Sequence, residues 1–234
     1  MVYRMKSDEK SAVVELRQLI HGSRLRDLMA VYGTALERRE ALRFDLPLLP
    51  ENLRSAVELL AIGDPMAEGR VRSLLSDDAI EAFLRMGILR LSNGSLSLDG
   101  LRLIYHFGIW SICENRNSTN ITYYYGEDSL ALGRLLVPAR GKALDVCSGT
   151  GAQGLLCALT ADSVDAVDKQ PKVEKLFKVN SVLNDVEGKM TLHIGDGIEP
   201  VKGKKFDTIC CNPPLLPVPD GVPYPFVLGF GPWW

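Results

Sequence analysis

The chain has 234 residues, of which 46% are hydrophobic and 24% are charged, and its mean hydropathy is +0.03. This composition excludes a disordered, collagenous or fibrous chain, and the length suggests two domains of modest size. The formal net charge is −2, and neither half has the basic excess expected of a protein that grips nucleic acid. Any nucleic-acid contact would therefore be local. The best candidates for it are six arginines, for which a solvated helical surface is the simpler interpretation. These candidates are Arg17, Arg24, Arg26, Arg38, Arg39 and Arg43.

The apolar segments and the cysteines bear on the compartment. Residues 1–10 are not followed by an apolar core and a small-residue cleavage site, so we predict no secretory signal. No stretch is apolar enough to cross a bilayer, and no membrane partner is expected. The cysteines are odd in number and lack CxxC spacing, which argues against a disulfide framework and a metal site and favours a reducing cytoplasm. They are Cys113, Cys147, Cys157, Cys210 and Cys211.

The first hundred residues predict short helices. Apolar residues recur at i, i+3, i+4 and i+7 in residues 51–62, which indicates an amphipathic helix that ends at Gly63. Residues 66–75 and 77–86 predict two more helices, the second of them capped by Ser76. The second helix is expected to bury Ile80, Phe83 and Leu84.

A small β element follows these helices. Residues 89–91 and 96–98 alternate apolar and polar side chains across Asn93-Gly94, a strong indication of a two-residue hairpin. Helices followed by a hairpin resemble a winged-helix module, a pattern that dimerisation and substrate-docking pieces share with DNA readers. Residues 101–125 are rich in β-branched and aromatic side chains and predict linking strands. We therefore expect a mainly helical, winged-helix-like domain over residues 1–119.

From about Gly126 short apolar runs alternate with helical segments. This alternation predicts an α/β domain over residues 120–234, with a parallel sheet covered by helices. The ligand of such a sheet binds beyond the carboxyl ends of its strands. The expected order is strand 143–147, helix 153–159, strand 163–167, helix 171–183, strand 190–194 and strand 206–211.

The strand 143–147 leads into a glycine-rich turn. Gly149, Gly151 and Gly154 form a G-x-G-x-x-G pattern between a strand and a helix, and Asp168 ends the next strand. This pattern is typical of a dinucleotide site, where a pyrophosphate approaches the helix N-terminus. It is equally typical of a nucleoside ligand whose amino-acid end lies over the turn. The turn alone leaves both alternatives open.

Two further features favour the second alternative. A carboxylate at Asp145, near the end of the first strand, suits a ligand with an ammonium group and would repel a pyrophosphate. Downstream stands Asn212-Pro213-Pro214-Leu215. With Asp168 and Asp196, these motifs resemble the class I S-adenosylmethionine-dependent methyltransferases, in the N-methylating branch with an N/D-P-P-Y/F/W motif. The resemblance implies a Rossmann-like sheet and S-adenosyl-L-methionine as cofactor.

The resemblance also implies roles for single residues. The turn at 149–151 would cradle the methionine portion of the cofactor, and Asp145 would bind its amino group directly or through water. Asp168 would accept both ribose hydroxyls, and Asp196 would contact the adenine amino group. Residues 123–128, from Tyr123 to Asp128, match in position a segment that covers the cofactor, although a packed sheet edge also explains the tyrosines. The implied cofactor residues are Tyr125, Asp145, Cys147, Ser148, Gly149, Thr150, Gly151, Asp168, Lys169, Asp196, Gly197 and Asn212.

The implied catalytic residues are Asn212, Pro213, Pro214 and Leu215. A planar amine or amide nitrogen is a poor nucleophile because its lone pair is delocalised. The side-chain oxygen of Asn212 and the carbonyl of Pro213 can accept its two hydrogens and direct the lone pair at the methyl group, and the prolines preorganise these acceptors. Leu215 departs from the aromatic residue of the family, which removes stacking and leaves room for a glutamine side chain or a small metabolite.

The resemblance covers about residues 120–227, whereas family members continue with further strands and helices. We therefore expect a C-terminally incomplete domain: a truncated or frameshifted product, a fragment, or a chain whose apolar tail covers the gap. By that plan the Asn-Pro-Pro strand is a sheet edge. Cys147 is expected to be a packing residue, and Cys210 and Cys211 are expected in the core.

These motifs predict an S-adenosylmethionine-dependent N-methyltransferase that acts on a planar amino or amide nitrogen of a macromolecule, either an RNA base or a protein glutamine. The alternatives are a small-molecule methyltransferase and a catalytically silent cofactor-binding or interaction protein. An oxidoreductase that uses NAD would leave Asn212-Pro213-Pro214 unexplained. A homodimer is expected either through the N-terminal domain or through the apolar tail.

Overall fold

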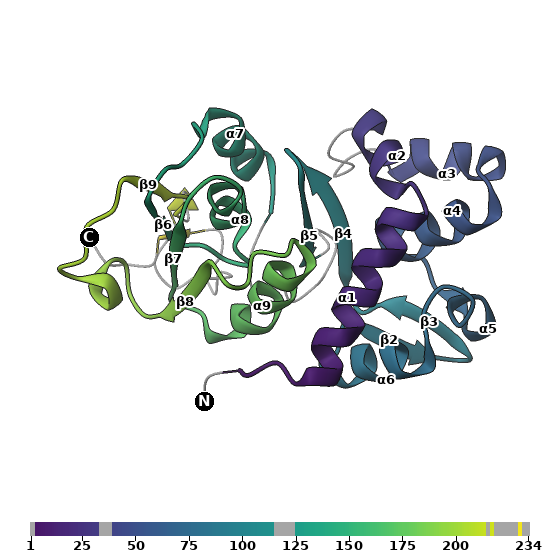
Figure 1. Cartoon of the computed structure of the whole chain (residues 1–234). Helices are drawn as coiled ribbons and strands as arrows, with labels where there is room; N and C mark the ends of the chain where they lie inside the picture. Colours follow the sequence, from purple (N-terminus) through teal and green to yellow (C-terminus); the bar gives the residue numbers. More distant parts are fainter. Residues whose placement is uncertain (1–2, 33–38, 115–124, 214–215, 218–228, 231–234) are drawn as a thin grey trace. The chain divides into compact units, whose positions relative to one another are not determined.

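The computed structural model describes residues 3–32, 39–114, 125–213, 216–217 and 229–230, which are drawn as ribbon in Figure 1. The chain forms two compact units. The first comprises residues 1–113 with 178–184, and the second comprises residues 114–177 with 185–234. The boundary expected between residues 119 and 120 lies outside the described residues.

The first unit begins with helices around a shared apolar core. Helix α1 (Ser7–Gly22) starts where the backbone N–H of Lys6 donates to the Glu9 carboxylate at 2.8 Å, and it packs against α6 (Asp77–Met86). Helices α2 (Leu25–Tyr32) and α3 (Arg39–Asp45) and the short η1 (Leu46–Leu48) follow. The inner face of α1 carries Ala12, Val13, Leu16 and Ile20, all buried.

The predicted helix over 51–62 is present but changes its winding. It begins as α4 (Glu51–Ala56) and continues as a π-helical segment, η2 (Val57–Ile62). Gly63 ends it in a left-handed conformation, and its N–H donates to the carbonyl of Glu58 at 3.0 Å. Five of the six side chains in this wider segment are buried in the core: Val57, Leu59, Leu60, Ala61 and Ile62.

The prediction of one helix over residues 66–75 is wrong at its start. Met66 and Ala67 form strand β1 (Met66–Ala67), because their backbone pairs with β3 (Ser95–Leu98), and only α5 (Glu68–Val71) is helical. Helix α6 has the predicted bounds, and the hydroxyl of Ser76 caps it by accepting from the N–H of Ala79 at 3.3 Å. Ile80 and Phe83 are buried and Leu84 is half-buried.

The predicted hairpin is also present. Strand β2 (Leu89–Ser92) pairs antiparallel with β3, and Asn93 and Gly94 at its tip both have positive φ, 50° and 72°, as a type I′ turn requires. With β1 added, the strands form a three-stranded sheet of order β1-β3-β2. Strands β4 (Leu101–His106) and β5 (Ile109–Glu114) form a separate two-stranded sheet.

Two asparagines cover the open edge of β5. Asn180 lies in α9 (Glu174–Leu183), and Asn184 follows one helical turn later. The side-chain amide of Asn184 pairs with the backbone N–H and C=O of Trp110, and that of Asn180 pairs with those of Ile112. Four helical residues rise about 6 Å and two strand residues about 6.7 Å, so the two spacings match. The helix thus continues the hydrogen bonding of the sheet.

The second unit contains the predicted parallel sheet. Strands β6 (Lys142–Val146), β7 (Ser163–Asp168), β8 (Met190–Ile194) and β9 (Thr208–Cys211) stand in the order β8-β7-β6-β9, and each neighbouring pair is parallel. Helices α7 (Glu127–Leu135) and α8 (Ala152–Ala158) pack together, and α8 packs on β6 and β7 (Figure 1). The short η3 (Pro171–Val173) precedes α9, and η4 (Glu199–Val201) follows β8.

Strand β6 is buried on both faces, which explains its nearly continuous apolar run. Leu144 and Val146 pack with Val167 and Val201 on one face, and Ala143 and Asp145 lie on the other. Because β6 lies between β7 and β9 and runs parallel to both, the carboxyl ends of these three strands lie side by side at the same end of the sheet.

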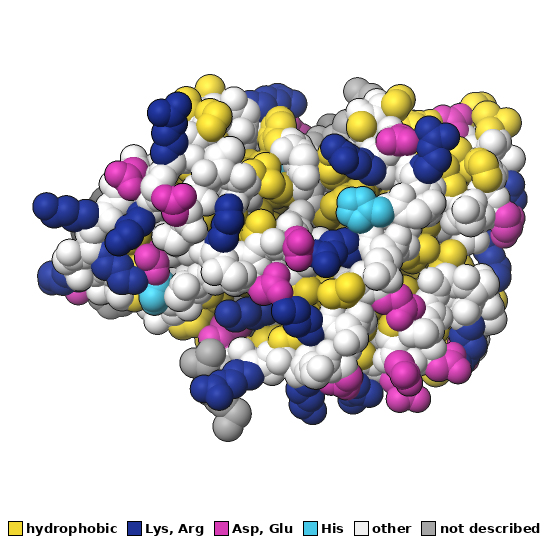
Figure 2. All heavy atoms as spheres, viewed as in Figure 1, with side chains coloured by type: hydrophobic (Ala, Val, Ile, Leu, Met, Phe, Trp, Pro, Cys, Tyr) yellow, Lys and Arg dark blue, Asp and Glu magenta, His cyan; other side chains and the backbone are white. Residues whose placement is uncertain are grey.

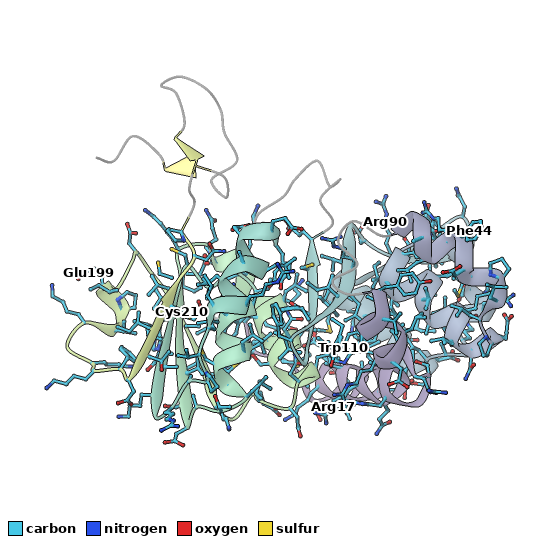
Figure 3. The ribbon with its side chains drawn as sticks, turned by 90° about the horizontal axis from the view of Figure 1, so that it is seen from above. Arg17, Phe44, Arg90, Trp110, Glu199 and Cys210 are labelled. Carbon is cyan, nitrogen blue, oxygen red and sulfur yellow. The ribbon has the colours of Figure 1, made fainter. Side chains whose placement is uncertain are left out.

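Strand β9 is the edge of this sheet within the described residues. Cys210 is buried, and Figure 3 shows it on β9 among the parallel strands. Cys211 is exposed, so its expected place in the core is wrong: on an edge strand alternate side chains point away from the covered face. Ile209 is likewise 62% exposed. A further parallel pair is β10 (Leu216–Pro217) with β11 (Gly229–Phe230).

The surface carries both signs of charge. Figure 2 shows Lys and Arg side chains interspersed with Asp and Glu over the face in view. Four of the candidate arginines for nucleic-acid contact have partners inside the first unit: Arg17 with the Val182 carbonyl, Arg24 with Asp27, Arg26 with Tyr105 and Arg43 with Asp64. No helix in the described part of the chain combines the length and apolarity of a membrane span.

Candidate functional site

The turn after β6 holds an unusual backbone conformation. Cys147, Gly149 and Gly151 all have positive φ, at 58°, 54° and 90°. The N–H of Ser148 donates to the carbonyl of Val167 at 3.0 Å, and the N–H of Gly151 donates to the Ser148 carbonyl at 2.8 Å. The turn is therefore tied to β7 and closed on itself. A left-handed cysteine is uncommon and marks a backbone that the surroundings fix.

Gly151 begins α8 and lies against the core. A Cβ atom at this position would come within 2.9 Å of the Phe177 ring, and φ at +90° disfavours any side chain. Ser148 and Thr150 between the glycines are buried. The turn therefore exposes mainly backbone, which suits a ligand that approaches it closely.

Asp145 lies beneath the turn and is completely buried. Its Oδ2 accepts a hydrogen bond from the N–H of Gly154 in α8 at 2.7 Å, and the Cys210 thiol lies 3.5 Å from its Oδ1. Burial raises the pKa of Asp145 to about 7, although the Gly154 N–H acts in the opposite direction. In this structure the carboxylate contacts the backbone of the helix that follows the turn.

Asp168 stands at the carboxyl end of β7, beside the turn. Its Oδ2 accepts from the N–H of Gly149 at 2.7 Å and its Oδ1 from the N–H of Gln170 at 2.8 Å. Burial raises the pKa of this carboxyl, against the lowering effect of these hydrogen bonds. The backbone N–H of Lys169 is a third donor to this carboxylate. A carboxylate has about four acceptor sites, so one remains for a donor from a ligand.

Three more predicted cofactor residues lie at the carboxyl ends of β7 and β8. Lys169 follows Asp168, and its Nζ lies 2.8 Å from Asp196 Oδ2. This ion pair is exposed, so it contributes little to stability and can reorganise around a ligand. Gly197 has φ of +52° and open space where a Cβ would stand.

Asn212 follows β9 and reaches α7. Its backbone N–H donates to the carbonyl of Val146, at the end of β6, at 3.3 Å. Its side-chain nitrogen donates to Asp128 Oδ2 at 3.0 Å and to Ser129 Oγ at 3.1 Å. The Asn-Pro motif and the glycine-rich turn therefore leave neighbouring parallel strands at the same sheet edge.

Several predicted site residues lie outside the described part: Tyr123, Tyr124, Pro214 and Leu215. Tyr125 is described and is buried, with 6% of its surface exposed. Ser129 and Gln153 were not among the predicted site residues, and Asp128 was expected only at the end of the segment that covers the cofactor. In the structure Asp128 and Ser129 bind Asn212, and Gln153 binds Ser129. The sequence signal for them was only an acidic and hydroxyl pair at the start of a helix, which is common.

Four cysteines near the glycine-rich turn and β9 interact as two pairs, Cys147 with Cys211 and Cys157 with Cys210. The Cys147 thiol donates a hydrogen bond to Cys211, which lowers the pKa of Cys211 to about 7 and raises that of Cys147. Cys210 and Cys157 interact similarly, and the pKa of Cys210 is raised while that of Cys157 is lowered. Among these thiols Cys211 is exposed, so it is the one with thiolate character and access.

The chain's own groups fit a ligand with amino-acid and ribose parts. The Ser148 hydroxyl is buried and has no hydrogen-bond partner among the described residues. Gly149 and Gly151 have no side chains to block the turn, and the Asp168 carboxylate stands beside it. A hydroxyl without a partner, an open turn and a carboxylate are groups that S-adenosylmethionine could engage.

Comparisons with known proteins identify this part of the chain. Residues 128–218 match the family described as the methyltransferase small domain. This match confirms the resemblance of the segment to the S-adenosylmethionine-dependent methyltransferases.

Three curated relatives show where the similarity lies. A Methanocaldococcus jannaschii protein, inferred to be a protein N5-glutamine methyltransferase, is 38% identical over 100 residues, 42% of this chain and 49% of the relative. The release factor glutamine methyltransferase of Aquifex aeolicus is 42% identical over 52 residues, 22% of this chain and 18% of the relative. The ribosomal protein uL3 glutamine methyltransferase of Bordetella pertussis is 33% identical over 77 residues, 32% and 26% of the two chains. The chain thus spans about half or less of these relatives.

Proposed function

We propose that the protein transfers a methyl group from S-adenosyl-L-methionine to the side-chain amide nitrogen of a protein glutamine. One observation carries this proposal: Asn212 and Pro213 leave β9 at the sheet edge where the glycine-rich turn leaves β6, with the Asn212 N–H on the Val146 carbonyl. The match of residues 128–218 to a methyltransferase domain supports it. The names of the relatives, which describe glutamine methyltransferases, support the choice of acceptor.

The residues of the turn would hold the cofactor, which supplies an electrophilic methyl group when bound. The backbone at Gly149–Gly151 and the Ser148 hydroxyl would bind the methionine portion, with Asp145 fixing the helix behind it. Asp168 would accept from the ribose hydroxyls, with one or more of its backbone hydrogen bonds giving way to them. Asp196, with Gly197 beside it, would accept from the adenine amino group, and Lys169 would then leave its ion pair. Cys147, Thr150 and Tyr125 would complete the lining of the cofactor site.

The acceptor chemistry depends on Asn212 and Pro213. The side-chain oxygen of Asn212 and the carbonyl of Pro213 would accept the two hydrogens of the glutamine amide and remove its lone pair from conjugation. The cofactor would supply its methyl group to this nitrogen, and its sulfur would keep the electron pair as the leaving group. The methylated nitrogen loses its extra proton to solvent afterwards, so no strong general base is required. Pro214 would stiffen the motif.

The fourth residue of the motif supports a glutamine side chain over a nucleobase. Leu215 cannot stack on a nucleobase as an aromatic residue would, and a flexible glutamine side chain needs no stacking partner. The mixed charge in view in Figure 2 also lacks the wide positive area that an RNA backbone favours. The alternatives are methylation of an RNA base, methylation of a small molecule, and cofactor binding without catalysis. Calorimetry and methyl-transfer assays separate them.

The first unit would present the substrate. Helix α6 followed by the β2–β3 hairpin, with β1 beside it, supports a winged-helix-like docking module. Such a module could also join two copies, and light scattering on the purified chain would detect a homodimer. All five cysteines are free thiols, which suits a reducing cytoplasm.

Calorimetry tests the cofactor site. We expect S-adenosylhomocysteine to bind the full chain, and Asp168→Ala to weaken binding by at least about tenfold, because a charged hydrogen-bond acceptor is lost. Asp162→Ala is the matched control, since it removes the same charge from exposed surface just before β7. Equal affinity in Asp168→Ala and the wild type would reject the assigned site.

Methyl transfer tests the reaction. Cofactor labelled in the methyl group is incubated with a glutamine-containing peptide, with the same peptide carrying asparagine instead, and with RNA and small-molecule fractions. Label in the glutamine peptide alone, lost in Asn212→Ala, is the expected result. Label in RNA or small molecules would replace the proposed substrate, and label in none with cofactor binding intact would establish the silent alternative.

A further inference from the structure

The side chain of Asn212 is held at its nitrogen end. The Nδ2 atom carries two hydrogens, and two acceptors on α7 face it: Asp128 Oδ2 at 3.0 Å and Ser129 Oγ at 3.1 Å. Both hydrogens are therefore accounted for. The Oδ1 atom takes part in neither of these bonds and is available to a ligand.

These two acceptors decide which way the amide points. The oxygen and nitrogen ends of an asparagine side chain have the same shape, so a half-turn exchanges them at little steric cost. An ionised carboxylate only accepts hydrogen bonds, and it would repel the amide oxygen. Asp128 thus selects the orientation in which the oxygen of Asn212 points away from α7.

The acceptors are themselves fixed by neighbouring elements. Asp128 lies in the first turn of α7, where the helix dipole favours a carboxylate. The backbone carbonyl of Ser129 accepts from Nε2 of Gln153 at 3.0 Å, and Gln153 is buried in the first turn of α8, directly after the glycine-rich turn. Gln153 therefore connects the residues that orient Asn212 to the turn that would hold the cofactor.

We propose that Asp128 and Ser129 are positioning residues that keep the side-chain oxygen of Asn212 turned toward the nitrogen to be methylated. This inference rests on the proposed function of Asn212. If the amide turned over, it would present N–H donors to the N–H donors of the substrate, and the lone pair of the substrate would not be directed. The pair should therefore govern the rate of methyl transfer and leave cofactor affinity unchanged.

Kinetics on the full chain test the proposal. In Asp128→Asn the new amide can offer either end to Asn212, so the orientation is no longer unique, and kcat for the glutamine peptide should fall by about tenfold or more. Ser129→Ala should lower kcat as well, and Ser129→Thr, which keeps the hydroxyl, should restore it. The dissociation constant of S-adenosylhomocysteine should stay within about twofold of the wild type in all three variants.

Glu127→Gln is the matched control, because it removes one negative charge from the same helical turn at an exposed side chain. It should leave kcat and cofactor affinity unchanged. An equal fall of kcat in Glu127→Gln would attribute the effect to general charge at α7 and overturn the proposal. So would a loss of cofactor affinity that matches the loss of kcat in Asp128→Asn.

A second measurement does not depend on activity. The side-chain amide resonances of Asn212, assigned by their loss in Asn212→Ala, should report two slowly exchanging hydrogens in the wild type. They should shift and exchange faster in Asp128→Asn and Ser129→Ala but not in Glu127→Gln. Unchanged resonances in the first two variants would overturn the positioning role. A wild type with this pattern but no transfer to glutamine would instead reject the proposed substrate.

Discussion

The carboxylate of Asp145, at the end of β6, accepts a 2.7 Å hydrogen bond from the backbone N–H of Gly154, which lies nine residues further along in α8. This bond ties the strand before the glycine-rich turn to the helix after it. The geometry of the turn is therefore held by a fully buried group whose pKa is raised by that burial.

The first prediction concerns the pH dependence of stability. The pKa of Asp145 is about 7 in the folded protein and 3.8 as the ordinary value, so the folded state binds this proton more tightly than the unfolded state. The stabilisation is complete below about pH 4 and is lost as the pH rises toward 7. The loss amounts to a few kcal/mol, at about 1.4 kcal/mol per pKa unit.

Asp145→Asn isolates this contribution, because its side-chain oxygen can still accept from Gly154 but cannot ionise. Urea unfolding of both proteins between pH 4.5 and 8 should give a wild-type curve that falls relative to the variant as the pH rises. Parallel curves over that range would show that Asp145 titrates near its ordinary pKa.

The second prediction concerns Gly151. An alanine here would place its Cβ about as close as 2.9 Å to the Phe177 ring, at a φ of +90°. We expect Gly151→Ala to lower the free energy of unfolding by about 1–3 kcal/mol and to weaken cofactor binding, because the turn must shift. Gly188→Ala, where nothing lies near the added Cβ, should stay within about 0.5 kcal/mol of the wild type. Similar unfolding curves for both variants would contradict the strain argument.

The third prediction concerns thiol reactivity. The hydrogen bond from Cys147 lowers the pKa of the exposed Cys211 to about 7, while Cys113, Cys157 and Cys210 are buried. Iodoacetamide at pH 7 should therefore modify Cys211 first, as peptide mass spectrometry can establish. Replacing Cys147 by alanine removes the donor, so alkylation of Cys211 should slow severalfold at pH 7. An unchanged rate would mean that Cys147 does not stabilise the thiolate.

The fourth prediction concerns the asparagine cover of β5. Asn180 is fully buried and hydrogen-bonds both the N–H and the C=O of Ile112. Asn180→Ala leaves two buried backbone groups without these partners, so we expect a loss of at least about 2 kcal/mol in the free energy of unfolding. The exposed Asn52→Ala should change it by less than about 0.5 kcal/mol. If Asn180→Ala also lost less than about 0.5 kcal/mol, water would have replaced the side chain as the partner of Ile112.

Much of the fold was predictable because it follows from local preferences. The Asn93-Gly94 turn requires two positive φ angles that these residues adopt easily, and the hairpin is present with the predicted strands. Short apolar runs between helical segments predicted the parallel sheet, since strands covered on both faces lose their alternation. The residues 66–67 were misjudged because strand pairing with β3, which is not local, overrides helical preference.

The amino-acid sequence by itself therefore determined the order of the strands and helices along the chain, the glycine-rich turn and the class of chemistry that Asn212 and Asp168 suggest. Only the tertiary structure decided that Asp145 faces Gly154, that Cys211 is exposed, and that Asn212 is held by Asp128, 84 residues before it. The physical reason is that turns and periodic patterns depend on neighbouring residues. The direction of a side chain at a sheet edge depends instead on strand order and on which helix packs beside it.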